Sequence, residues 1–291
     1  EKLKSTLMYK PFELQKMLNS LGEIAFKGTE EGRLFFESSE VCGLEDCELL
    51  HKLPYEQSPL LRDREPKSQF CFAHLMVQEF FAAKYLVDTM SKEQIERFVH
   101  NHISVGTWQV VLLFLAGLLK SSSSDILMKL LPKSTVEKEN LEREKMIFWP
   151  KRNKDLVVKV CKYLYEITDV QRSELENKIE KISFNAVDLS GCSLTPIDLA
   201  AVLHFLENAE KVLHIRLDSS ELGDASAKYV NKFIIKRECK LKSLSLSKNK
   251  FTDKAVKDLA DALKQSNCEL ECLFFSDNEL TKNGRQDLID A

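Results

Sequence analysis

The chain has 291 residues, of which 44% are hydrophobic and 30% charged, and its 42 basic and 45 acidic residues give a formal net charge of −3. This composition is typical of a folded globular chain and excludes disorder over most of the length. The near-neutral balance gives no sign of binding to nucleic acid or to an acidic membrane surface.

Apolar runs and cysteines predict where the protein resides. The longest apolar run, Val110 to Leu119, has ten residues, about half of the roughly 20 that a spanning helix needs, so it predicts a core helix. The eight cysteines are scattered, and no Asn-x-Ser/Thr acceptor occurs. We therefore expect a cytoplasmic protein, and the first residue, Glu1 instead of Met, predicts a piece of a longer chain.

The first 70 residues alternate between helical and extended patterns. Apolar side chains at helical spacing over residues 12–26 predict a helix that Gly28 ends. Residues 33–37 read as a short strand, residues 44–53 as a short helix, and residues 54–67 as a polar loop. A helix, a short strand and a turn in this order are what the end of a winged-helix domain looks like.

The most distinctive non-repeating segment runs from Phe70 to Leu86 and contains F-x-H-x-x-x-Q-E-F-F-A-A. It resembles the motif at which the winged-helix domain of NOD-like receptors ends and their second helical domain begins. Residues 21–36 and the helix over residues 108–119 are similar to further stretches of the same family. The resemblance implies three parts: residues 1–70 as the C-terminal part of a winged-helix domain, 71–180 as the second helical domain, and 181–291 as leucine-rich repeats.

In that family a central nucleotide-binding module switches between a closed ADP state and an open, oligomerising ATP state. Its winged-helix histidine contacts the phosphates of ADP, and the resemblance transfers this role to His74 in the intact parent protein. Imidazole suits the role because it can donate a hydrogen bond to a phosphate oxygen near neutral pH. The alternative is a histidine at a helix start that is satisfied by a backbone carbonyl.

Residues 121–167 connect the helical region to the repeats. The tetrad Ser121–Ser124 predicts a helix break or cap. Residues 133–145 are charge-rich and residues 150–154 are locally basic, as in a solvated surface connection. Apolar residues then recur at helical spacing from Leu156 to Ile167. They predict a last helix that packs onto the first repeat.

The pattern L-x-x-L-x-L-x-x-N/C-x-L occurs four times in the last third of the chain, beginning at Phe184, Val212, Leu241 and Leu270, with spacings of 28, 29 and 29 residues. Alternating apolar residues predict a short strand in each repeat, and helical patterns follow over residues 198–206, 225–235 and 253–263. The sequence therefore predicts an α/β fold: a mainly helical N-terminal region, then a solenoid like that of ribonuclease inhibitor with a short parallel sheet, which continues beyond residue 291.

Polar residues at the turn of each repeat have a predicted structural role. Asn249 and Asn278 follow the strand where the chain turns inward, so their side chains can satisfy buried backbone groups of neighbouring repeats. Ser220 and Cys192 occupy the same position in the second and first repeats and fit it less well. Cys239 and Cys268 also lie one repeat apart, and we expect packed thiols there, not a metal site.

The alternate positions of the predicted strands face outward and form the candidate recognition surface for a protein or microbial ligand. We assign to it Arg216, Asp218, Ser245, Ser247, Phe274 and Ser276. No phosphate-binding loop, nucleophile elbow or His-Glu-x-x-His pair occurs, so we expect no enzyme, no metal and no cofactor in this chain.

The resemblance implies that ADP or ATP binds the parent protein, whose nucleotide-binding module lies upstream and which oligomerises with itself on activation. The chain would then be the regulatory and ligand-sensing part of a cytosolic innate immune receptor. The alternative is a constitutive leucine-rich-repeat scaffold or inhibitor that binds a protein partner without any nucleotide switch.

Overall fold

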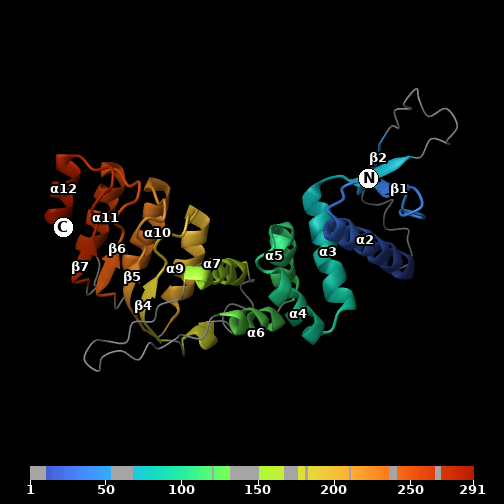
Figure 1. The fold of residues 1–291 in the computed structure, drawn as a ribbon, viewed down its shortest axis with the longest axis horizontal. Coiled ribbons are helices and arrows are strands. Elements are labelled where there is room, and N and C mark those ends of the chain that lie inside the picture. Colours follow the sequence, from blue (N-terminus) through green and yellow to red (C-terminus); the bar gives the residue numbers. More distant parts are fainter. Residues whose placement is uncertain are drawn as a thin grey trace. The chain divides into compact units, whose positions relative to one another are not determined.

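The computed structural model describes residues 11–53, 68–119, 121–131, 151–166, 176–180, 183–209, 211–235, 241–265 and 270–291. It is a mixed α/β structure with a small parallel four-stranded sheet. The chain divides into two compact units, Glu1–Ser122 and Ser123–Ala291, drawn in blue to green and in green to red (Figure 1).

The helices of unit 1 are α2 (Pro11–Glu31), α3 (Leu75–Thr89), α4 (Lys92–His102), the short 3-10 helix η1 (Gly106–Trp108) and α5 (Gln109–Leu118). Helix α3 packs against both α2 and α5. Side chains from each of these three helices are fully buried, including Leu21, Leu86 and Val111. The predicted apolar helix over residues 110–119 is therefore confirmed as α5, and its buried side chains form part of this core.

Helix α2 ends later than predicted. Gly28 lies inside the helix, and the helix stops at Gly32, which has φ +67°. The Arg33 N–H donates to the Gly28 carbonyl at 2.7 Å and the Gly32 N–H to that of Thr29 at 3.3 Å, which is the Schellman arrangement. Gly28 is needed for a different reason, because a Cβ there would lie 2.6 Å from the Phe36 ring.

A three-stranded antiparallel sheet in the order β1-β3-β2 completes unit 1, with β1 (Phe36–Glu37), β2 (Leu50–Leu53) and β3 (Gln69–Phe72). The short helix predicted over residues 44–53 is wrong. Successive turns cover residues 41–50, and Leu50 then pairs with Phe72 in the sheet. Pairing with a strand twenty residues away thus overrides the local helical spacing. The predicted loop over residues 54–67 lies outside the described residues.

Unit 2 contains most of α6 (Ser121–Leu130), then α7 (Lys151–Tyr165), and four strands that alternate with helices. These are β4 (Ser183–Asp188), α9 (Pro196–Glu207), β5 (Lys211–Arg216), α10 (Asp224–Ile235), β6 (Ser243–Ser245), α11 (Asp253–Gln265), β7 (Cys272–Phe274) and α12 (Lys282–Ile289). We call each strand with the helix that follows it a coil, numbered 1 to 4. The four helices lie side by side (Figure 1).

The strands pair in parallel in the order β4-β5-β6-β7, and equal positions of the repeat lie opposite one another. Val187 pairs with Ile215, Ile215 with Leu244, and Leu244 with Leu273. The parallel sheet and the three predicted helices between its strands are confirmed. Helix α7, predicted from residue 156 onward, packs on α9 of coil 1.

Asn249 holds coils 2 and 3 in register. Its Oδ1 accepts from the Ser220 and Leu222 N–H groups, both at 3.0 Å, while Nδ2 donates to the Leu217 and Leu246 carbonyls at 2.9 and 3.0 Å. The residue before it, Lys248, has φ +56°, and the equivalent residues of the other coils also have positive φ, between 55° and 75°. This left-handed step turns the asparagine inward, where the predicted role is confirmed.

Candidate functional site

His74 is the N-cap residue of α3. Its backbone is extended, with φ −153° and ψ 145°, and its Nδ1 accepts a hydrogen bond from the Met76 N–H at 3.1 Å. The ring is exposed. The expected alternative, a ring satisfied by a backbone carbonyl, is thus wrong in detail, because the partner is an N–H group at the helix start.

The cap fixes which ring nitrogen of His74 can donate. A nitrogen that accepts from a backbone N–H carries no proton, so the neutral ring has its proton on Nε2. This assignment follows from the hydrogen bond between Nδ1 and Met76. His74 therefore presents an N–H donor away from the helix start, in the form that an acceptor oxygen requires.

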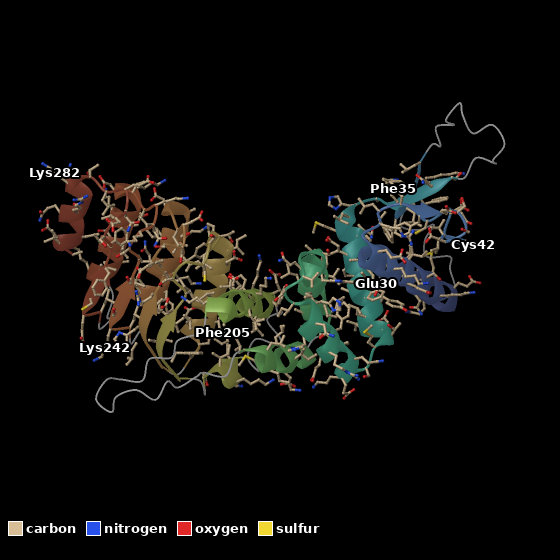
Figure 2. The ribbon with its side chains drawn as sticks, in the orientation of Figure 1. Glu30, Phe35, Cys42, Phe205, Lys242 and Lys282 are labelled. Carbon is tan, nitrogen blue, oxygen red and sulfur yellow. The ribbon has the colours of Figure 1, made fainter. Side chains whose placement is uncertain are left out.

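Four large apolar side chains, two at the start of α3 and two ahead of β1, are only half-buried. Leu75 and Met76 on α3 are 50% and 53% exposed, and Leu34 and Phe35 ahead of β1 are 48% and 50% exposed. Gln78, which is buried, donates from Nε2 to the Arg33 carbonyl at 3.0 Å, so the two segments lie side by side. We call the four apolar residues the His74 rim, and Phe35 is labelled in Figure 2.

Glu79, five residues after His74, is part-buried. Burial raises the pKa of its carboxyl, while the nearby His74 lowers it by a smaller amount. Thr29 of α2 is a buried polar residue of unit 1, and its hydroxyl donates to the Ala25 carbonyl at 2.9 Å. Both groups belong to the packing of α2 and α3.

The predicted recognition residues of the sheet separate into exposed and covered groups. The Arg216 side chain is 49% exposed, Phe274 is 53% exposed and Ser276 is exposed. Ser245 and Ser247 were predicted to project outward, but they are 6% and 9% exposed. Ser245 lies between the larger residues Arg216 and Phe274 of the neighbouring strands, and Ser247 is also buried, so the prediction of their exposure is wrong.

Asp218 explains why these serines are covered. Its Oδ1 accepts from the Ser245 hydroxyl and from the Ser247 N–H, the latter at 2.9 Å, and its Oδ2 accepts from Arg216 Nη2 at 3.4 Å. The carboxylate is therefore turned along the sheet toward coil 3. Both oxygens of Asp218 are used in hydrogen bonds within the sheet, so we assign it a role in orienting its neighbours and not in direct ligand contact.

Helix α7 contributes an ion pair that the sequence patterns did not suggest. Lys154 is 9% exposed, and its Nζ lies 2.9 Å from Asp188 Oδ1 and 3.1 Å from the Ser190 carbonyl oxygen. Burial alone would raise the pKa of Asp188, but hydrogen bonds from Ser190 and Lys154 together outweigh it and lower that pKa. The sequence did not indicate this ion pair, because Lys154 lies in a basic segment that was predicted to be a solvated surface connection.

No group of histidine, cysteine, aspartate and glutamate within the described ranges is arranged to hold a metal ion. Burial raises the pKa of the Cys161 and Cys192 thiols, which makes both poor nucleophiles. Cys239 and Cys268 lie outside the described residues. None of the described helices is both long and apolar enough to cross a bilayer.

No family model matches the chain.

Proposed function

We propose that the chain is the regulatory and ligand-sensing part of a cytosolic NOD-like receptor. In this proposal residues 1–70 end a winged-helix domain, residues 71–180 form the second helical domain, and residues 181–291 are leucine-rich repeats of a solenoid. The chain restrains or relays a nucleotide-dependent oligomerisation switch that lies upstream. The chain itself carries out no catalysis.

The observation that carries the proposal is the state of His74. The ring is exposed, its Nδ1 is occupied by the Met76 N–H, and its Nε2–H is therefore free to donate. A phosphate oxygen is a matching acceptor. The His74 rim adds four half-exposed apolar side chains on the two segments that Gln78 links, and exposed apolar surface marks sites that another module covers.

The coils support the second half of the proposal. Their 28- to 29-residue spacing, parallel strands and inward asparagines agree with the repeat class that the sequence resembles. Stacked coils of this kind form extended recognition surfaces. We therefore place ligand sensing on the outer face of the sheet, at Arg216, Phe274 and Ser276, with Asp218 orienting the residues beside it.

The test joins this chain to its upstream nucleotide-binding module and measures ADP retention and oligomer size. We expect His74→Ala to weaken ADP retention by about tenfold, since a hydrogen bond to a charged phosphate is lost, and to increase spontaneous oligomerisation. His74→Ser keeps an N-cap acceptor but is too short to replace Nε2, so it should have the same effect.

The control is His100→Ala, which removes an exposed histidine near the end of α4 and should leave ADP retention unchanged. If His74→Ser retains ADP as the parent protein does, then His74 acts only as a helix cap. Equal retention in all three variants would contradict the role of His74.

One observation favours the alternative, a constitutive repeat scaffold that binds a protein partner. Helix α7 packs on α9, and its Lys154 and Lys162 form ion pairs with Asp188 and Asp198 of coil 1. A helix docked in this way covers the first coil, as the terminal cap of a self-standing repeat protein does. A parent reading frame without an upstream phosphate-binding loop would favour the scaffold.

A further inference from the structure

The outer face of the sheet has one row of side chains that runs across all four strands. Backbone register places Asp188 beside Arg216, Arg216 beside Ser245, and Ser245 beside Phe274. We call these four residues the outer row. Because the four strands are neighbours in one sheet (Figure 1), the row forms a line across the strands and not along any one of them.

The first position of the outer row is already occupied from within the chain. Lys154 of α7 forms its ion pair with Asp188. The carboxylate of Asp188 is thus paired with a lysine that stands on a helix. The two large side chains left on the row, Arg216 and Phe274, are each about half exposed.

Arg216 is prepared to receive a carboxylate. Its contact with Asp218 is long, at 3.4 Å, and involves one nitrogen of the guanidinium group. The other oxygen of Asp218 accepts hydrogen bonds from Ser245 and Ser247, so the carboxylate is not directed at Arg216 alone. A guanidinium has five donors in a planar fork that fits a carboxylate, and the half-exposed side chain leaves donors for an acidic group from outside.

Phe274 lies at the other end of the free part of the row. Its ring is 53% exposed, and the small side chain of Ser245 separates it from Arg216. Aromatic and arginine side chains are enriched at protein interfaces relative to the rest of the surface. The pair therefore fits a partner that offers one acidic and one apolar side chain.

The spacing of the pair selects the shape of the partner. Arg216 and Phe274 are two strands apart, about 10 Å at the usual strand separation. Residues seven apart on an α-helix share a face and are separated by roughly 10.5 Å. On an extended segment the side chains of one face are about 7 or 13 Å apart, which fits less well.

We propose that the outer row between Arg216 and Phe274 binds an amphipathic α-helix of a protein partner, which lies across the strands and presents a carboxylate to Arg216 and an apolar side chain two turns away to Phe274. This inference rests on the proposed sensing role of the sheet and names the partner that it takes. Two observations point to this occupant: the positive charge of the half-exposed Arg216, and the ion pair that Lys154 of helix α7 already makes with Asp188 of the same row.

The test selects binders to the whole 291-residue chain from a phage-displayed library of 20-residue peptides. We expect enriched peptides to be helical and to carry Asp or Glu seven residues from a large apolar residue. Both Arg216→Ala and Phe274→Ala should weaken their binding at least about tenfold. Arg216→Glu should select basic residues in place of the acidic ones.

Matched controls come from the helical side of coil 4, where Arg285 and Ile289 are exposed. Arg285→Ala and Ile289→Ala should leave the binding of the selected peptides unchanged. Binding that survives both Arg216→Ala and Phe274→Ala, or selection without an acidic and apolar pair, would overturn the proposal. The result is independent of ADP retention by the parent protein, so failure of the nucleotide switch does not decide it.

Discussion

The two units of this protein hold their elements together by different means. Unit 2 repeats one arrangement, in which an inward-turned asparagine binds the backbone of the neighbouring coil, as Asn249 and Asn278 do. Unit 1 relies on shape: Gly22 and Gly28 let α2 approach α3 and Phe36 closely, and Phe26 packs among Tyr85 and Trp108. Register in one unit is set by hydrogen bonds, and in the other by the fit of apolar surfaces.

The largest expected effect tests the hydrogen-bonded unit. Asn249→Ala would leave the Ser220 and Leu222 N–H groups and the Leu217 carbonyl without partners inside the core, while the Leu246 carbonyl keeps its bond from Asn278. Each unsatisfied buried group costs about 1–3 kcal/mol, so we expect the free energy of unfolding of unit 2 to fall by about 4 kcal/mol. Urea unfolding of the whole chain measures this change.

Asn278→Ala is the matched control, because Asn278 is only half-buried and binds the Phe251 N–H, the Leu246 carbonyl and the Phe275 carbonyl. Its loss should cost about half as much. If the two substitutions destabilise equally, the asparagines do not stabilise the unit through buried backbone groups.

A smaller effect tests the shape-fitted unit. Gly28→Ala would place a Cβ 2.6 Å from the Phe36 ring and 2.9 Å from Gln78 Nε2. We expect a loss of about 2 kcal/mol from over-packing, visible as a lower thermal midpoint of unit 1.

Gly117→Ala provides the contrast. Gly117 is also helical, but none of the described residues that pack against its helix would lie within 4 Å of an added Cβ. Alanine favours helix over glycine by roughly 0.5–1 kcal/mol, so this variant should be more stable than the parent. A stabilising Gly28→Ala would show that unit 1 tolerates a wider approach of its helices.

The smallest effect concerns pH and the docking of α7. The pKa of Asp188 is lowered in the folded protein, so the stability that its charge supplies is present above the ordinary Asp value of 3.8 and is lost as pH falls below it. Lys154→Met removes one cause of the lowering and leaves burial, which raises the pKa. In that variant the folded-state pKa of Asp188 lies closer to the ordinary value, so we expect less stability to be lost as pH falls.

The Lys154 pair should contribute about 1 kcal/mol near neutral pH, and chemical unfolding of both proteins between pH 6 and 3 measures the difference. Lys178→Met is the control, since its pair with Asp125 is more exposed. The same acid profile in the Lys154→Met variant and the parent would mean that the ion pair does not hold α7 to coil 1.

Sequence patterns predicted the periodic unit better than the other. The strand and helix positions of the coils and the roles of Asn249 and Asn278 follow from spacing alone, because each coil repeats the environment of the last. The errors lie where contacts are specific to one place. Leu50 pairs with Phe72 instead of continuing a helix, and Ser245 is covered because Asp218 of the neighbouring coil binds it.

The candidate sites divide in the same way. The sequence by itself determined that His74 precedes a helix and that Arg216 and Phe274 stand on strands, because these positions follow from local periodicity. Only the tertiary structure decided that Met76 occupies His74 Nδ1, that Lys154 reaches Asp188, and which strand residues remain exposed. Hydrogen bonds and burial depend on which atoms the fold brings within a few ångströms, and a linear pattern does not contain those distances.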